Sequence, residues 1–360
     1  MTLTIVADDL TGACDTGTLF AGKGPVPVTV WPADPVDAPV RVVDTETRGV
    51  GPGEATERVR RVAATAGRCF KKIDSTLRGH IGVEVSALLA AVGAPGALLC
   101  PAFPAQGRVV VDRVLLIDGV PLAETTLARD PAFPTPASNI LDLLRPSIDC
   151  ALAWIPITEV RGPVARLAER LGRLVGTVAV ADAESHADLD ALVAAVALLD
   201  RPPLLVGSAG LARALAHSLG LATEPPALPA GRRWLVVAGS RHPVTRAQVA
   251  TARAAGVPVL AAPEPERPDR ARVAADLAAE AARLLKRELF DALAVTGGDT
   301  AVALYRALGA ERVDLLGAPA PGLALGHLWA PRRPPLPVLT KAGGFGDAAL
   351  FVRVTRGGRA

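Results

Sequence analysis

The chain has 360 residues, of which 50% are hydrophobic and only 3% aromatic, so its cores must be built from Ala, Val and Leu. This length is too great for one typical domain and sufficient for two substantial cores. A net charge of +3, spread along the chain, argues against nucleic acid as a partner. Four cysteines without C-x-x-C spacing argue against a zinc site or a disulfide framework and favour a reducing cytoplasm.

No segment predicts a signal peptide or a membrane span. The first apolar run lacks a basic segment before it and is interrupted by Asp8 and Asp9. The longest uncharged run, 85–107, contains three prolines and several glycines, which break it into a helix and a strand. We therefore expect a soluble cytoplasmic protein with no membrane partner and no protein-held metal.

The first polar segment follows an apolar strand expected over 3–7 and precedes a helix expected over 16–21. Between them lie three carboxylates, Asp8, Asp9 and Asp15. The carboxyl ends of strands are where open α/β sheets bind ligands. Paired carboxylates there can hold a sugar hydroxyl, accept a proton or coordinate magnesium through water. The alternative is that Asp9 or Thr11 caps the following helix.

The densest polar segment is 70–84, which joins an expected strand ending at Ile73 to a helix expected over 81–92. Its polar side chains are Lys71, Lys72, Asp74, Ser75, Thr76, Arg78 and His80. They predict a ligand site at a strand exit, and Arg78 beside Gly79 suggests a forked donor next to closely approached backbone. The alternative is a helix-capping cluster at 74–76, and the residues alone do not decide between the two.

A third polar segment, 44–49, follows a strand expected over 40–44. We call such a segment, directly after the carboxyl end of a strand, a strand exit. Three successive exits with hydrogen-bonding side chains predict one polar pocket for a small, multiply hydroxylated ligand. Further strands alternate with helices up to residue 222, apart from a hairpin or excursion expected over 109–116. This alternation predicts a mostly parallel sheet.

The segment 223–233 contains three prolines and a glycine, which predicts a linker. We therefore divide the chain into an N-terminal domain over 1–222, this linker, and a C-terminal domain over 234–360. The expected fold class is α/β, with two domains that each hold a mostly parallel sheet flanked by helices.

The expected strand exits of the C-terminal domain are rich in glycine, serine and threonine instead of carboxylates. They are Gly239-Ser240, 296–300 and 341–347. Glycine lets backbone N–H groups approach phosphate oxygens, and a helix N-terminus adds positive charge. Three such turns at one sheet edge predict a polyphosphate or nucleotide site. The P-loop pattern is absent, as is G-x-G-x-x-G.

These motifs stand in the same order as in the four-carbon acid sugar kinases, which the chain resembles over nearly its whole length. The matching segments are 7–13 with Asp15, 72–79, 103–108, 118–122, 207–211, 296–301 and 341–346. The resemblance implies phosphorylation of a tetronic acid, such as threonate, erythronate or an oxo-tetronate, with ATP and Mg²⁺. It also implies an N-terminal sugar-acid domain and a C-terminal nucleotide domain.

The resemblance assigns roles to individual positions. The acid pocket would be lined by Asp8, Asp9, Lys72, Asp74, Ser75 and Arg78. ATP would be held by Ser240, Gly297, Gly298, Asp299, Thr300, Gly343 and Gly344. His80 and Cys14 stand where many relatives have Asn, and the chain is short around 260–330. These departures leave the substrate and the adenine contacts open.

In the mechanism expected from this resemblance, Arg78 and Lys72 bind the carboxylate of the acid. Asp9, before Asp8, orients or deprotonates the terminal hydroxyl, and Asp299 or a magnesium that it steadies faces the γ-phosphate. Two alternatives remain, a nucleotide-dependent oxidoreductase of sugar acids and a non-catalytic regulator that binds both ligands. Whether the chain forms a homo-oligomer also stays open.

Overall fold

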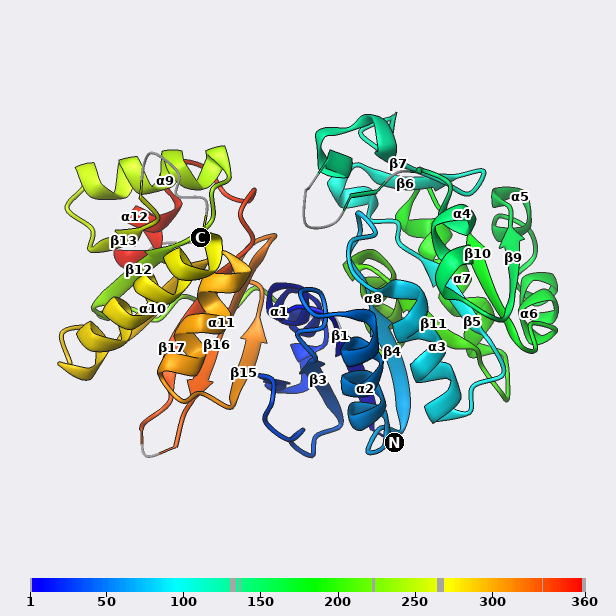
Figure 1. Cartoon of the computed structure of the whole chain (residues 1–360), viewed down its shortest axis with the longest axis horizontal. Coiled ribbons are helices and arrows are strands. Elements are labelled where there is room, and N and C mark those ends of the chain that lie inside the picture. The colour runs from blue at the N-terminus through cyan, green and yellow to red at the C-terminus, as the bar shows by residue number, and fades with distance from the viewer. Residues whose placement is uncertain are drawn as a thin grey trace. The chain divides into compact units, whose positions relative to one another are not determined.

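A computed structural model describes residues 2–129, 134–135, 137–221, 224–263, 269–331 and 333–357. It is an α/β structure in which helices flank sheets dominated by parallel strands, which confirms the expected fold class (Figure 1). Two compact units are present. Unit 1 comprises Met1–Gly12 and Thr45–Leu221, and unit 2 comprises Ala13–Asp44 together with the described part of Ala222–Ala360.

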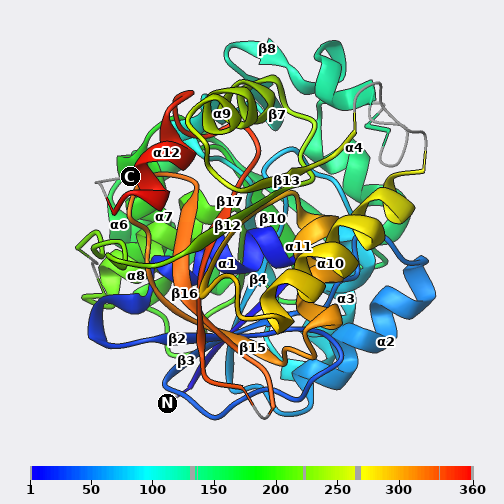
Figure 2. The same ribbon diagram turned by 90° about the vertical axis from the view of Figure 1, so that its left-hand side faces the viewer.

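The sheet of unit 1 is entirely parallel, because each strand returns to it through a helix. Its strands, in spatial order, are β1 (Leu3–Ala7), β4 (Arg68–Lys72), β11 (Leu204–Gly207), β5 (Ala97–Cys100), β10 (Thr177–Ala181) and β9 (Ala151–Ile155). One face is covered by α2 (Pro52–Ala63) and α3 (Ile81–Val92), and the other by α6 (Val164–Gly172), α7 (His186–Ala197) and α8 (Ala209–Ser218) (Figure 2). The carboxyl ends of these strands therefore share one edge.

An antiparallel excursion interrupts this pattern, as the sequence predicted. It consists of β6 (Arg108–Val111), β7 (Val114–Ile117) and β8 (Val120–Pro121), and short helices α4 (Ile140–Leu144) and α5 (Ile157–Val160) follow it. The fully buried Asp182 accepts the backbone N–H groups of Asp112 at 3.1 Å and Arg113 at 3.0 Å. It also accepts the indole N–H of Trp154 at 3.1 Å. One carboxylate thus ties the β6–β7 turn to β9 and the end of β10.

The sheet of unit 2 combines parallel and antiparallel strands. Its spatial order is β13 (Val259–Ala261), β12 (Trp234–Ala238), β14 (Ala292–Thr296), β17 (Leu336–Lys341), β16 (Leu323–Trp329), β15 (Arg312–Gly317), β2 (Val26–Thr29) and β3 (Val40–Asp44). The first four are parallel, whereas β16 and β15 are antiparallel to their neighbours. Helices α9 (Pro243–Ala254) and α12 (Leu350–Thr355) lie on one side of it, and α10 (Arg270–Lys286) and α11 (Gly298–Ala307) on the other (Figure 2).

The compact units are not continuous in sequence. Residues 13–44, which include most of α1 (Leu10–Thr18), group with unit 2, because β2 pairs with β15 along Val26–Thr29. This pairing joins segments nearly 300 residues apart, and no local pattern signals it. Of the predicted linker 223–233, residue 223 lies outside the described residues and 224–233 contains neither helix nor strand. Within the described ranges, no helix is both long and apolar enough to span a bilayer.

Candidate functional site

The first polar exit is shaped by a helix that begins earlier than predicted. Helix α1 starts at Leu10, whereas the sequence suggested a start at Thr16. The reason is Asp9, whose Oδ1 accepts the backbone N–H of Gly12 at 3.2 Å and so caps the first turn. The capping alternative is therefore confirmed for Asp9, and Asp15 lies inside α1 instead of at the strand exit.

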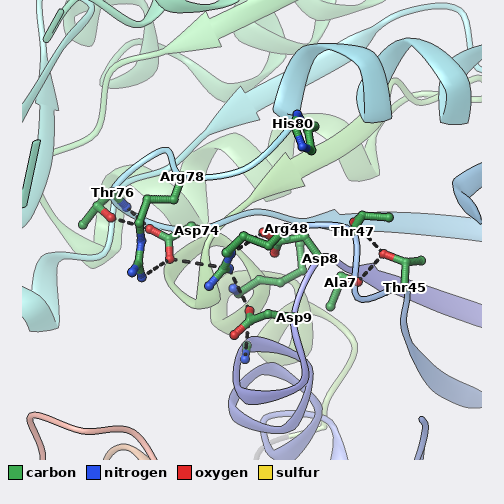
Figure 3. Close-up of polar contacts among 12 residues, drawn as sticks. Ala7, Asp8, Asp9, Thr45, Thr47, Arg48, Asp74, Thr76, Arg78 and His80 are labelled. Carbon is green, nitrogen blue, oxygen red and sulfur yellow. Dashed lines mark hydrogen bonds and ion pairs between the residues drawn. The ribbon is translucent and has the colours of Figure 1, made fainter. Parts of the chain in front are cut away.

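Arg48 connects the carboxylates of two exits, and the sequence analysis did not place it in the site. Its Nε donates to Asp8 Oδ2 at 2.8 Å and its Nη2 to Asp9 Oδ1 at 2.7 Å, while Asp74 Oδ2 lies 3.5 Å from Nη2 (Figure 3). Its backbone N–H also donates to Asp8 O at 3.2 Å. The only sequence signal was an arginine in the polar segment 44–49.

The loop after β4 is organised by Asp74. Its Oδ1 accepts the backbone N–H of Thr76 at 2.7 Å and also the threonine hydroxyl, and its Oδ2 accepts Arg78 Nη2 at 2.6 Å (Figure 3). Helix α3 begins only at Ile81, with His80 as N-cap and no side-chain capping bond. The capping alternative for 74–76 is therefore wrong, because α3 begins only at Ile81 without a side-chain cap and Asp74 bonds within its own loop.

The same loop brings its backbone close to the first exit. Gly79 has φ of 98°, and a Cβ at this position would stand 3.0 Å from Asp8 Oδ2. The side chain of Ser75 is nearly buried, and its hydroxyl accepts a hydrogen bond from Arg108 Nη1 at the start of β6. Arg108 is a second arginine that the sequence analysis did not assign to the site.

Burial and neighbouring cations set the ionisation of two of these carboxylates. Burial by itself would raise the pKa of Asp8, but the charges of Arg48 and two lysines outweigh it and hold the pKa below its usual value. For Asp74, Arg48 and Arg78 outweigh burial in the same way, and the pKa lies well below its usual value. Both groups stay ionised at neutral pH and act as anchors for the arginines.

Lys72 differs from the other cations of this cluster. Its side chain is nearly buried, and its Nζ would stand 2.7 Å from a Cβ added to Gly12. Across the described residues, this ammonium makes no hydrogen bond and no ion pair. The adjacent Lys71 has Glu84 Oε2 at 2.7 Å and is fully buried. A buried cation that has no bonded partner among the described residues is well suited to bind an anionic ligand.

The structure therefore brings the six predicted acid-site residues together in unit 1. Counting Arg48 and Arg108, the cluster has one more cation than carboxylates, which suits a ligand with one negative charge. His80 is turned away from it, since Nε2 contacts Val50 O at 2.6 Å (Figure 3). A cavity of about 210 Å³ lies beside His80, between the start of α3 and α4.

The predicted nucleotide residues of unit 2 also meet at one place, the carboxyl ends of neighbouring strands β12, β14 and β17. Gly297 has φ of 101°, and a Cβ there would stand 2.8 Å from Ser240 N. A Cβ on Gly343 would stand 2.5 Å from Ser240 Oγ. The three turns are thus packed so closely that only glycine fits at their contacts.

Helix α11 begins within the second of these turns. Gly297 is its N-cap without a side-chain capping bond, Asp299 lies exposed in its first turn, and Thr300 is buried. The open N–H groups of this ten-residue helix and the neighbouring glycine turns suit an anion. In the described ranges, no three His, Cys, Asp or Glu side chains are grouped to hold a metal ion.

Comparisons with known proteins find a sugar-binding part before a nucleotide-binding part, the order that the sequence predicted. A family model described as a sugar-binding N-terminal domain matches residues 3–215, and one described as a nucleotide-binding C-terminal domain matches 258–351. A D-threonate kinase of Bordetella bronchiseptica is 34% identical, over 98% of this chain and 96% of its own length. A D-erythronate kinase of Heliobacterium modesticaldum is 34% identical over 68% of this chain and 58% of its own length.

A solved structure adds a likeness of fold. A Bordetella bronchiseptica domain of unknown function is 32% identical, with a TM-score of 0.54 and coverage of 100% of both chains. That structure is described as a domain-swapped dimer with bound citrate.

Proposed function

Because this chain belongs to the four-carbon acid sugar kinase family, we propose that it transfers the γ-phosphate of ATP to the terminal hydroxyl of a four-carbon sugar acid. D-Threonate is the first candidate substrate, and erythronate or an oxo-tetronate is the alternative. The observation that carries the proposal is the acid-site cluster, in which the buried Lys72 has no bonded partner among the described residues and lies near ionised carboxylates. A hydroxyl-rich monocarboxylate complements both features.

We assign the acid's carboxylate to Lys72 and Arg78. Lys72 has no competing partner among the described residues, whereas Arg78 already donates to Asp74. Arg78 can use a second edge of its guanidinium fork for the substrate, because five N–H donors are available on this group. Arg48 would act on the substrate indirectly, because it holds Asp8 and Asp9 in place.

Asp9 is the better candidate for the group that orients or deprotonates the hydroxyl. Its side chain is 23% exposed, compared with 3% for Asp8, and only Oδ1 is engaged in the described structure. A general base must reach the proton that it removes, which the buried Asp8 cannot do without rearrangement. Asp8 is accordingly an anchor for Arg48.

The nucleotide is assigned to Ser240, the turn 297–300 and Gly343-Gly344. Phosphoryl transfer requires mainly positioning and charge neutralisation, which backbone N–H groups at a helix N-terminus provide. Mg²⁺ would be bound by the phosphates, with Asp299 as the exposed carboxylate that steadies it. When bound, the ion would neutralise charge on the transferred group. We also propose that the protein is cytoplasmic and that it assembles into a homo-oligomer.

An ADP-release assay tests this function directly. Purified protein with ATP and Mg²⁺ is supplied with D- and L-threonate, D-erythronate, and 2- or 3-oxo-tetronates, and the product is identified by phosphorus NMR. Release of ADP with formation of a 4-phosphate is expected for one of these acids. Nicotinamide reduction without ADP release would indicate an oxidoreductase, and binding of both ligands without turnover would indicate a regulator.

A further inference from the structure

Lys341, the last residue of β17, carries a charge that the predicted mechanism does not use. The residue is 1% exposed. Its Nζ donates to the carbonyl oxygens of Ala342 at 3.0 Å, Gly343 at 2.9 Å and Phe345 at 3.1 Å, and to Thr245 Oγ1 at 3.3 Å. All four acceptors are neutral. Over the described part of the chain, no carboxylate forms an ion pair with this ammonium.

These contacts determine which way the turn 342–346 faces. Two further side chains on α9 pull its carbonyls inward, since Thr245 Oγ1 donates to Gly343 O at 2.8 Å and Gln248 Nε2 to Phe345 O at 2.9 Å. The N–H groups of Gly343 and Gly344 have no acceptor among the described residues. With its carbonyls held inside, the turn presents these N–H groups outward beside Ser240, as anion-binding backbone concavities do.

We propose that Lys341 is a positioning residue for the nucleotide: a buried positive charge that holds the 342–346 turn open to the phosphates and is neutralised by them. This inference rests on the proposed function. Lys341 does not touch the ligand, because its three protons are already shared among four acceptors.

A second buried lysine shows why the missing counter-charge matters. Lys71 is as deeply buried but has Glu84 at 2.7 Å, so its charge is balanced within the protein. Lys341 has no such partner in the part of the chain that the structure describes, and burial lowers its pKa to about 8. A polyphosphate bound above the turn would favour the ammonium form and raise this pKa, so binding should be coupled to proton uptake above about pH 8.

Other charged groups near the turn have to be separated from Lys341 in such a measurement. His242 is the N-cap of α9, Asp299 lies in the first turn of α11, and Asp347 pairs with Arg353 of α12 at 2.7 Å. Lys341→Met keeps all of these groups. The part of the proton uptake that this substitution removes therefore reports on Lys341.

The test is calorimetric titration of the whole protein with ADP at about pH 8.5 in two buffers of different ionisation enthalpy. Wild type should take up a fraction of a proton per ADP. Lys341→Met should take up none and bind ADP about tenfold or more weakly, with the KM for the acid within about twofold of wild type. Lys286→Met, which removes an exposed lysine of α10, is the matched control and should behave like wild type.

The outcomes separate this inference from the proposed function. Absence of proton uptake by wild type, or ADP binding by Lys341→Met equal to that of wild type, would overturn the role of Lys341. Proton uptake by a wild type that phosphorylates no acid would support Lys341 and reject the kinase assignment. If Lys341→Met fails to fold, Lys341→Arg and Lys341→Gln take its place: neither should take up a proton as wild type does, and the arginine variant should retain ADP binding better than the glutamine variant.

Discussion

The two candidate sites use the same structural position, the carboxyl ends of parallel strands, in opposite ways. The site of unit 1 is built from side chains, with Arg48 shared by three carboxylates. The site of unit 2 is built from backbone, with Gly297 and Gly343 packed against Ser240. A hydroxy acid is recognised by the direction of each polar group, which side chains supply. Phosphates need many N–H donors at close range, which glycine-rich turns and helix N-termini provide.

The largest expected effect is on chemistry in unit 1. Asp9→Asn should lower kcat by about 10²–10⁴-fold, because a general base contributes this much. The fold should persist, since Asn caps a helix as well as Asp does and can still accept the N–H of Gly12. Steady-state kinetics and a thermal melt check both statements. The exposed Asp37→Asn is the control, and a near-normal kcat for Asp9→Asn would reduce this residue to a cap.

The next largest effect is on the stability of the protein, through the same cluster of side chains. Arg48→Met should destabilise the protein by about 3–5 kcal/mol, because it leaves Asp8 and Asp74 as buried charges without their shared partner. Denaturant unfolding measures the change. Arg60→Met, an exposed arginine on α2, should stay within about 0.5 kcal/mol of wild type. Equal unfolding midpoints for both variants would contradict the view that Arg48 holds the cluster together.

A smaller effect is expected at the backbone site. Gly297→Ala places a Cβ 2.8 Å from Ser240 N in a backbone with φ of 101°, so we expect a rise in the KM for ATP that corresponds to about 1–3 kcal/mol. The KM for the acid should not change. Gly309→Ala is a matched control, because Gly309 also has positive φ but has open space around it. An equal KM for ATP in both variants would remove the 297–300 turn from the site.

The smallest effect sharpens the role of Arg78. Arg78→Lys keeps the charge but loses the planar fork that can serve Asp74 and a carboxylate ligand together. Because the Arg78 side chain is 36% exposed, we expect only about a 5- to 30-fold loss of kcat/KM for the acid, with the KM for ATP unchanged. Arg166→Lys on α6 provides the comparison for a surface arginine. Wild-type kinetics for Arg78→Lys would leave the acid's carboxylate to Lys72.

Local pattern predicted much of the fold and the residue types of both sites. The apolar run 40–44 and the periodic segment 81–92 became β3 and α3 with the expected bounds, because each carries its own propensity and its own stop signals. The polar or glycine-rich strand exits could be located from the sequence because they follow strands whose ends are marked by such local stop signals. Parallel topology then brought them together at sheet edges, as the alternation of strands and helices predicted.

Other features depend on contacts between distant segments, which no local pattern contains. The sequence by itself determined that Asp9, Lys72 and Arg78 stand at strand exits. Only the tertiary structure showed that Arg48 joins these exits and that β2 pairs with β15 across nearly 300 residues. It also selected Asp9 from the two residues that the sequence offered as the cap of α1. The physical reason is that an ion pair or a strand pairing between distant segments forms only where the fold brings those segments together and buries them. Lys341 shows the same limit, because only the folded structure surrounds its buried ammonium, within the described ranges, with neutral acceptors alone.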